Sequence, residues 1–494
     1  MKTYELFINN QWVKASSGRY IESYNPANGE LIGRVASATV EDVDRACQAA
    51  RSAADLWSNM DPSQRADMLM KVGEGIRKRL DEFARMEAMD AGKPISETVG
   101  FDIPFSAYAF EYFARISQEI YGDVIPVLNG NKRQIFNFTT YEPYGVVAVI
   151  SPFNYPLHLL TRSLAPALAA GNTIICKASS MTPMTTSMLG EIILEAGIPA
   201  GVVNIISGSG SVCGEALASH PEVDIIAFTG SEAVGRKLME VSSKSPIIKK
   251  TILELGGKGP VIVQADCNQE SAIESLLLGL CSNQGQVCCA TTRLYLQESI
   301  YDEFLEKFRF ALKGIKIGDT LDPSVQMGSL ISKDHRDKVN KYVEDAVAAG
   351  ARLVYGGKPY EEGECRNGAY YLPTVLDQLD NNFACVKEEI FGPVVTVQPY
   401  KTLDEAIALA NDTSFGLGAN IFTEDYRVAY LAARAINAGT VWVNMPNGSL
   451  MNCPFGGNKN SGMGREYGIV GLKEYLKIKN NMWNMKIGKF SYYD

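Results

Sequence analysis

The chain has 494 residues, a formal net charge of −9, 46% hydrophobic residues and 21% charged residues. This composition is typical of a globular protein with room for about three domains, and it excludes disordered, collagen-like and coiled-coil chains. The acidic balance argues against a nucleic-acid partner, because phosphate binding requires a basic surface.

No apolar run reaches the length of about 18 residues that a membrane span needs. The N-terminal segment MKTYELFINNQWV mixes polar and apolar residues and lacks the apolar block of a signal peptide. We therefore expect a cytoplasmic protein with no membrane contact.

The cysteine and histidine content limits the available chemistry. The ten cysteines show no CxxC spacing, and His158, His220 and His335 are the three histidines of the chain. These counts predict neither a disulfide framework nor a metal site. The chemistry should therefore come from cysteine, carboxylate and lysine side chains together with a bound cofactor.

The N-terminal part is predicted to hold a short strand pair followed by helices. Helical periodicity covers Glu41–Trp57, Ser63–Met89 and Ile103–Gln118. The alternating stretch Lys132–Glu142, rich in Phe, Tyr and Thr, is typical of an exposed strand or an arm.

From residue 145 onward, strand-like and helix-like segments alternate. The strand-like segments are Gly145–Ile150, Asn172–Lys177, Val202–Ile206 and Asp224–Phe228, and the helix-like ones are Leu157–Ala170, Pro183–Ala196, Val212–Ser219 and Ser231–Val241. This alternation predicts a parallel sheet with helices on both faces, a common nucleotide-binding architecture.

The alternation continues more loosely after residue 258 and predicts a second α/β domain. Its helices are expected at Ser271–Leu280, Ile300–Leu312, Asp334–Ala349 and Leu403–Asn411, and its strands at Arg293–Leu296, Val394–Pro399 and Thr440–Asn444. The tail Leu476–Ile487 is predicted either as a strand used in oligomer contacts or as a frayed end.

Candidate cofactor contacts lie where predicted strands end. Phe228–Ser231 forms a strand-to-helix turn with Gly235 one turn later, and such a turn presents free N–H groups at the positive end of a helix dipole. The spacing GxxxxG is neither GxGxxG nor a Walker loop, so an ordinary turn is the alternative. Gly210 follows another strand, and Lys177 ends a third, where a lysine is placed to bind ribose hydroxyls.

Three further motifs suit nucleophilic catalysis on a carbonyl group. Cys288 and Cys289 lie beside a glycine turn, and a thiolate is a strong nucleophile near neutral pH. Glu254 ends an apolar run, where burial would raise the pKa of its carboxyl and suit a general base. Asn154, between two prolines, is a rigidly held amide of the kind that stabilises an oxyanion. Taken singly, each also fits a structural role.

Together these motifs resemble those of the aldehyde dehydrogenase superfamily over essentially the whole chain. The matching segments, in chain order, are Pro152–Pro156, Phe228–Ser231, Leu253–Lys258, Asn283–Cys288 with Arg293, Glu388–Pro393 and Pro454–Glu466. The resemblance implies an α/β fold with a Rossmann-type cofactor domain, an α/β catalytic domain and an oligomerisation arm.

The resemblance also implies domain bounds and an assembly. The NAD(P)-binding domain is expected at 1–122 and 143–253, the catalytic domain at 254–455, and the arm at 123–142 and 470–494. Such an arm implies a homodimer or homotetramer.

By the same resemblance, Cys288 attacks an aldehyde, the Asn154 amide and the Cys288 backbone N–H hold the oxyanion, and Glu254 activates the water that releases a carboxylic acid. The implied contacts of NAD or NADP are Ile150, Pro152, Phe153, Lys177, Ser180, Gly210, Phe228, Gly230, Ser231, Gly235, Leu255, Glu389 and Phe391. The family's CoA-acylating branch typically lacks the base carboxylate, so Glu254 favours hydrolysis, with CoA-dependent acylation and a catalytically inactive structural relative as alternatives.

Two positions depart from common family patterns. Many NAD-preferring relatives carry a glutamate where this chain has Ser180, so we expect NADP to be tolerated or preferred. Arg162 stands where many relatives have an aromatic residue, and members acting on lactaldehyde-like or aromatic aldehydes look similar here. Arg162 therefore predicts a small hydroxyaldehyde, semialdehyde or aromatic aldehyde as substrate, with betaine aldehyde or general aliphatic aldehydes as the alternative.

Overall fold

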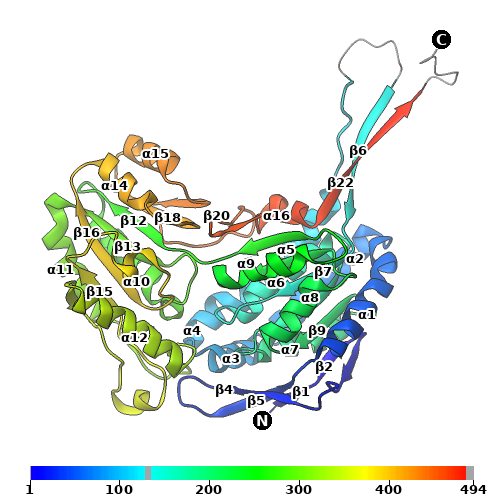
Figure 1. Ribbon diagram of the computed structural model, residues 1–494, viewed down its shortest axis with the longest axis horizontal. Coiled ribbons are helices and arrows are strands. Elements are labelled where there is room, and N and C mark those ends of the chain that lie inside the picture. The colour runs from blue at the N-terminus through cyan, green and yellow to red at the C-terminus, as the bar shows by residue number, and fades with distance from the viewer. Residues whose placement is uncertain (1, 128–134, 486–494) are drawn as a thin grey trace.

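The computed structural model describes residues 2–127 and 135–485 and consists of two α/β lobes with a projecting two-stranded arm (Figure 1). The predicted α/β class is confirmed. Within the described residues, no helix is long and apolar enough to cross a membrane.

The first large sheet contains eight strands within the described residues. In pairing order they are β21 (Gly462–Met463), β11 (Lys250–Glu254), β10 (Ile225–Thr229), β7 (Val146–Ile150), β8 (Thr173–Ala178), β9 (Val203–Ser207), β2 (Leu6–Ile8) and β3 (Gln11–Val13). The five strands from β11 to β9 run parallel, so their carboxyl ends lie at one edge of the sheet.

Strand β7 shows why this sheet needs helices on both faces, because all five of its residues, VVAVI, are buried. Val147 and Val149 pack into the core formed with α6 (Pro156–Ala169) and α7 (Met184–Glu195). Their neighbours in sequence pack into the core formed with α1 (Val40–Ser58), α8 (Glu215–Ser219) and α9 (Glu232–Ser243). Successive side chains of a strand point to opposite faces, so a continuous apolar run fits a sheet covered on both sides.

The second large sheet contains seven strands in the same described part of the chain. In pairing order they are β14 (Arg352–Tyr355), β15 (Thr374–Asp377), β16 (Val394–Tyr400), β13 (Thr291–Gln297), β12 (Gly259–Val263), β18 (Gly418–Phe422) and β19 (Thr440–Val443). One face packs on α10 (Gln269–Cys281) and α11 (Tyr301–Leu312), and the other on α14 (Leu403–Asn411) and α15 (Tyr426–Ala435).

The remaining strands and helices complete the two lobes. They are β1 (Lys2–Tyr4), β4 (Tyr20–Tyr24) and β5 (Leu31–Ala36) in one small sheet, β17 (Phe415–Gly416) with β20 (Asn458–Lys459) in another, and α4 (Ile95–Glu97), α5 (Ile103–Ile116), α12 (Lys333–Ala348), α13 (Ala384–Lys387) and α16 (Gly468–Glu474). A π-helical turn, Thr98–Asp102, joins α4 to α5.

Two predicted helices differ from the structure. The stretch predicted as Ser63–Met89 is divided into α2 (Pro62–Lys78) and α3 (Leu80–Ala91), because Arg79, with φ −109° and ψ 23°, ends one helix and begins the next. The helix predicted at Val212–Ser219 begins with a π-helical turn, Gly210–Gly214, before α8. Hydrophobic periodicity indicates which face of a helix is buried, but it does not indicate such a local change of helix geometry.

The arm consists of β6 (Ile135–Pro143) and β22 (Leu476–Asn484), which pair antiparallel along their whole length. In Figure 1 this ribbon projects from the body beside α16. The tail is therefore a strand at Leu476–Asn484, while the remaining parts of the predicted arm at 128–134 and 486–494 lie outside the described residues. The domain bounds stay predictions.

Candidate active site

The ends of the parallel strands bring the predicted residues of the first lobe together. Ile150 ends β7, Lys177 lies next to the end of β8, and Glu254 ends β11 beside Thr229 of β10. Ligands of open α/β sheets bind outside the carboxyl ends of the strands. A cavity of about 570 Å³ lies at this edge.

Twelve of the thirteen predicted cofactor contacts line this cavity. They are Ile150, Pro152, Phe153, Lys177, Ser180, Gly210, Phe228, Gly230, Ser231, Leu255, Glu389 and Phe391. Gly235 is not among the lining residues: it is buried, and a methyl group there would lie 2.7 Å from Leu255 Cδ2. Gly235 thus allows α9 to pack closely on the segment after β11.

The turn between β10 and α9 has the geometry of an anion site. Ser231 is the N-cap residue of α9, and its hydroxyl accepts a hydrogen bond from the backbone N–H of Val234. The Gly230 N–H donates to the Glu254 carbonyl over 3.0 Å, which ties this turn to the end of β11. The N-terminus of the twelve-residue α9 therefore faces the cavity with its positive dipole end.

The opposite end of the cavity is held by residues from the second lobe. Glu389 Oε1 accepts the backbone N–H of Gly257 over 2.9 Å, and burial raises the pKa of Glu389 to about 7. Phe391 has a φ of 57°, and its carbonyl lies 2.7 Å from His335 Nε2. His335 and Lys338, both on the first turns of α12, also line the cavity. Sequence analysis missed them, because nothing in their local pattern distinguishes them from ordinary helix residues.

The loop carrying the two thiols adopts an unusual backbone. Asn283, Gln284 and Gly285 follow α10 with φ values of 43°, 57° and 71°. Left-handed conformations are costly for residues with a Cβ and persist where the surroundings fix them. Here the fixing groups are side-chain amides: Gln284 Oε1 accepts the Gly328 N–H over 2.9 Å, and Gln286 Oε1 accepts the Ile331 N–H over 3.0 Å.

Cys288 lies where two cavities meet. It lines the cavity at the strand ends, called the cofactor-side cavity below, and also a second cavity of about 380 Å³. Cys289 lines only the second cavity. The carbonyl of Cys288 packs against Gly257, where a Cβ would lie 2.1 Å from the oxygen. The two thiols share a hydrogen bond, which together with burial raises the pKa of Cys288, and the Arg162 guanidinium opposes this rise.

Asn154 is the other predicted catalytic residue that lines both cavities. Its side-chain amide nitrogen donates to the Gln286 backbone carbonyl over 2.9 Å, and the Asn154 backbone carbonyl accepts from Asn283 Nδ2 over 2.8 Å. The side chain is 4% exposed. Because Asn154 lines both cavities, the second N–H of this fixed amide is available to a ligand bound there.

Glu254 lines the cofactor-side cavity and is 2% exposed. Within the described residues, neither carboxylate oxygen has a hydrogen-bond partner. Burial raises the pKa of Glu254 to about 8, and the nearby Arg162 guanidinium limits the rise. A carboxyl with free oxygens and a pKa near the working pH is suited to accept a proton from water.

Arg162 projects from α6 into the second cavity while 2% exposed. Its Nη2 donates to Thr229 Oγ1 over 2.9 Å, and its guanidinium lies 5.8 Å from the ring centroid of Tyr467 and 5.9 Å from that of Phe455. Within residues 2–127 and 135–485, Arg162 forms no ion pair and its Nε has no hydrogen-bond partner. A buried guanidinium in this state favours an anionic or polar ligand group.

His158, on the same helix, packs among aromatic rings. Its Nε2 lies 2.7 Å from the Tyr467 hydroxyl, and the rings of Phe105 and Phe101 have centroids 4.9 Å and 5.2 Å away. Burial holds the pKa of His158 well below its usual range. The residue is therefore a neutral part of the cavity wall.

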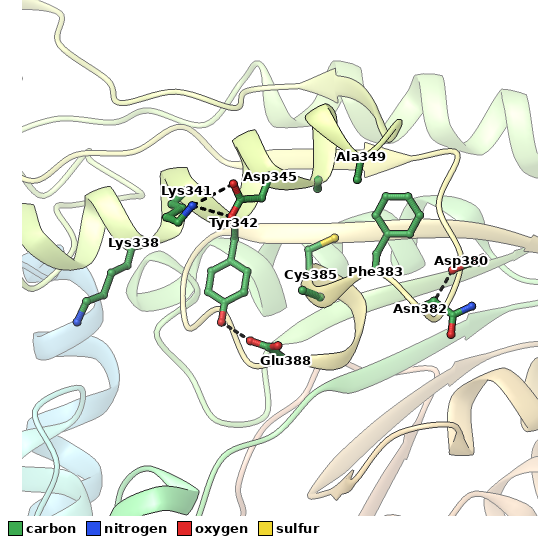
Figure 2. A pocket seen from close by; sticks show the side chains of 12 residues that line it. Lys338, Lys341, Tyr342, Asp345, Ala349, Asp380, Asn382, Phe383, Cys385 and Glu388 are labelled. Carbon is green, nitrogen blue, oxygen red and sulfur yellow. Dashed lines mark hydrogen bonds and ion pairs between the residues drawn. The ribbon is translucent and has the colours of Figure 1, made fainter.

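Figure 2 shows a third, larger hollow of about 810 Å³ between α12 and the segment 380–388. None of the predicted site residues lines it. Tyr342 donates to Glu388 Oε2 over 2.6 Å, and Lys341 pairs with Asp345 over 2.9 Å. Several of its polar groups are thus directed to one another, and Cys385, the thiol that lines it, is 2% exposed with a pKa that burial raises.

Two cavities that meet at one thiol are what a cysteine-dependent oxidoreductase requires, and comparison with known proteins agrees. Residues 12–481 match the model of the aldehyde dehydrogenase family. The chain therefore belongs to the aldehyde dehydrogenase family, and the expectation of an oxidoreductase of this family is confirmed.

Relatives with different named substrates are similar to this chain. A 2-hydroxymuconic semialdehyde dehydrogenase from Pseudomonas sp. (strain CF600) is 41% identical, over 97% of this chain and 99% of its own length. The crystal structure of PnpE from Pseudomonas sp. WBC-3 superposes with a TM-score of 0.96 at 39% identity, covering 100% of both chains, and PnpE has also been solved with nicotinamide adenine dinucleotide. Betaine aldehyde dehydrogenase from Staphylococcus aureus, in complex with NAD+, has a TM-score of 0.95 at 35% identity and covers 99% of this chain and 96% of its own.

Proposed function

We propose that this protein oxidises an aldehyde to a carboxylic acid, using Cys288 as nucleophile, Asn154 as oxyanion donor and Glu254 as general base. The observation that carries the proposal is the position of Cys288 and Asn154 at the junction of two cavities. Only such a junction lets one thiol hold a substrate that a cofactor approaches from the other side.

The cofactor-side cavity fits a nicotinamide dinucleotide. The α9 N-terminus suits a pyrophosphate, Lys177 and Ser180 would contact a ribose at the strand ends, and Glu389 and Phe391 line the same cavity from the second lobe. NAD dependence is supported by the NAD complexes of related structures. When bound, the cofactor supplies the acceptor for the hydride.

In the first half-reaction, Cys288 Sγ bonds to the aldehyde carbon and gives a thiohemiacetal. The Asn154 amide and the Cys288 backbone N–H stabilise the negative charge that develops on the oxygen. Arg162 favours the thiolate, because its positive charge lowers the pKa of the Cys288 thiol. Loss of hydride then leaves a thioester on Cys288.

In the second half-reaction, Glu254 accepts a proton from water as the water oxygen attacks the thioester carbon. The C–S bond breaks, the carboxylic acid leaves, and the Cys288 thiolate is regenerated. The free carboxylate oxygens of Glu254 are available for this proton transfer. Their presence favours hydrolysis over transfer of the acyl group to CoA.

The substrate class follows from the wall of the second cavity. The Arg162 guanidinium lies there without an ion pair, and its Nε has no hydrogen-bond partner among the described residues, so we propose an aldehyde with a carboxylate, hydroxyl or polar ring substituent. The relatives named above act on both a semialdehyde and betaine aldehyde according to their names, so the family alone does not choose. The same guanidinium disfavours a cationic substrate.

An aldehyde panel tests both parts of the proposal. Initial rates would be measured on glycolaldehyde, lactaldehyde, succinic semialdehyde, benzaldehyde and betaine aldehyde, with and without CoA. We expect acid formation without CoA, with betaine aldehyde the slowest. Product that requires CoA would overturn hydrolytic release, and betaine aldehyde as the fastest substrate would overturn the role given to Arg162.

Two Arg162 variants separate substrate binding from support of the thiolate. Arg162→Met should lower kcat/KM for succinic semialdehyde about tenfold more than for benzaldehyde, whereas Arg162→Lys keeps the charge and should retain most of that preference. Equal losses on both aldehydes would show that Arg162 acts only on the catalytic groups.

The cytoplasmic location and the homodimer or homotetramer stay predictions.

A further inference from the structure

A short segment that sequence analysis did not single out contacts both catalytic loops. Residues 93–102 follow the end of α3 and comprise the turn α4 and the π-helical turn Thr98–Asp102. π-Helical turns are rare and are frequent at functional sites. Two residues of this segment, Glu97 and Phe101, also line the second cavity, which under the proposed function holds the substrate and is called the aldehyde-side cavity below.

Glu97 contacts the loop that carries Cys288. Both of its carboxylate oxygens lie 3.0 Å from the backbone N–H of Asn283, the first left-handed residue of that loop. Asn283 Nδ2 in turn donates to the Asn154 carbonyl over 2.8 Å and to the Gln286 carbonyl over 3.1 Å. A continuous chain of hydrogen bonds therefore runs from Glu97 to both the oxyanion donor and the nucleophile loop.

Lys93 contacts the loop that carries Asn154. It is fully buried, pairs with Asp102 over 2.5 Å, and its Nζ lies 3.4 Å from the ring centroid of Tyr155. Tyr155 follows Asn154 directly in the chain. A cation held over an aromatic ring in a desolvated site fixes the position of that ring.

We propose that Glu97 is a positioning residue that holds the Cys288 loop in register with Asn154, while the Lys93–Asp102 pair fixes the Asn154 loop from the same segment. The inference rests on the proposed function, because it takes Cys288 as nucleophile and Asn154 as oxyanion donor. Glu97 acts through Asn283 and takes no part in the chemistry itself.

The charge-assisted bonds explain why a carboxylate is needed here. The Asn283 N–H belongs to a residue with a costly backbone conformation, and an ionised acceptor bonds more strongly than a neutral one. Burial raises the pKa of Glu97 to about 7, while the Lys93 ammonium and the Asn283 N–H itself oppose this rise and favour the ionised carboxylate. Glu97→Gln keeps one carbonyl oxygen for this N–H, whereas Glu97→Ala leaves it without an acceptor. We therefore expect graded effects, with glutamine intermediate between glutamate and alanine.

The test compares wild type, Glu97→Gln and Glu97→Ala, with Glu274→Gln as matched control. Glu274 is exposed on α10, the helix that leads into the same loop. For each variant we would measure kcat, KM for the aldehyde and for the cofactor, and the rate at which iodoacetamide alkylates Cys288, located by fragmentation of its peptide because Cys289 adjoins it. Thermal unfolding would report folding.

We expect kcat and the alkylation rate of Glu97→Ala to fall together, kcat by about 100-fold, with the cofactor KM unchanged. Glu97→Gln should recover part of both, and Glu274→Gln should match wild type. If Glu97→Ala fails to fold, the same paired fall in Glu97→Gln carries the test.

Two results would overturn the proposal. One is a wild-type alkylation rate in the Glu97 variants; the other is a rise in aldehyde KM alone, which would make Glu97 a substrate contact. Failure of the proposed function is distinct, because wild type itself would then oxidise no aldehyde.

Discussion

The two cavities that meet at Cys288 are built in different ways. The cofactor-side cavity is formed largely by strand ends and turns of one sheet, from β7 to β11, closed by Glu389 and Phe391. The aldehyde-side cavity is formed by side chains from distant segments, among them Phe101, Arg162 and Tyr467. The first therefore depends on the backbone of the fold, and the second on the choice of side chains.

This difference separates what the family shares from what distinguishes its members. A phosphate at a helix N-terminus binds backbone N–H groups, which any sequence that folds this way supplies. Under the proposed function an aldehyde is selected by side chains such as that of Arg162, which substitution can change without loss of the fold. Variants at the junction should affect all substrates, variants on the aldehyde side should affect choice of aldehyde, and variants on the other side should affect choice of cofactor.

The largest effect is expected at the junction itself. Cys288→Ala should reduce turnover by at least about 10³-fold, because no other group at the meeting point of the cavities can form the thioester. Cys289→Ala is the matched control and should retain most activity, because Cys289 faces only the aldehyde side and its carbonyl accepts from Asn447 over 2.8 Å. Steady-state rates of cofactor reduction measure both.

The thiol pair makes this comparison informative. The shared hydrogen bond lowers the pKa of Cys289 and raises that of Cys288, so acidity alone would favour the other thiol. Position relative to the two cavities favours Cys288. An inactive Cys289→Ala beside an active Cys288→Ala would assign the nucleophile to Cys289.

The next largest effect is expected for Glu254→Gln, which should slow deacylation by roughly 10²- to 10⁴-fold. Thioester formation does not need this base, so a burst of one reduced cofactor per active site should persist before the slow phase. Rapid-mixing measurements of cofactor reduction would separate the two phases. Loss of the burst together with the steady rate would show that Glu254 acts before deacylation.

The pH dependence of the slow phase follows from the burial of Glu254. Burial raises the pKa of its carboxyl to about 8, so at lower pH the group is protonated and accepts no proton from water. The deacylation rate should therefore rise with pH through about 8 and level off above it. Glu254→Gln should remove this rise, and a rise that persists would assign it to another group.

Most residues that the sequence proposed for the cofactor line one cavity of the structure, because they stand in compact motifs at strand ends. Asn154 and Cys288 lie in loops and Glu254 ends β11, each close to glycines or prolines that are visible locally, and the parallel strands of the first sheet bring Asn154 and Glu254 to one edge. The prediction of an α/β fold followed from the same alternation. Gly235 does not line the cavity, and spacing alone does not separate a phosphate-binding glycine from one that allows helix packing.

The sequence did not predict the supporting groups, because their partners are distant in the chain. Glu97 lies 186 positions from Asn283, and His335 lies 56 positions from Phe391. A glutamate in a short helical turn and a histidine at a helix start have many ordinary roles. Only the packing of the lobes shows that they hold the nucleophile loop and the cofactor-side cavity.

The smallest effect is expected at Ser180, which is exposed at the end of the cofactor-side cavity near Lys177. A serine carries no charge that would repel a 2′-phosphate, so we propose that the enzyme accepts NADP as well as NAD. Ser180→Glu should raise KM for NADP about tenfold or more through like-charge repulsion, while KM for NAD stays level or falls because a carboxylate binds ribose hydroxyls. Ser180→Gln, of similar size without charge, is the control and should leave the ratio of the two KM values near wild type. If Glu and Gln change the ratio equally, bulk rather than charge is responsible, and if neither changes it, residue 180 lies away from the ribose.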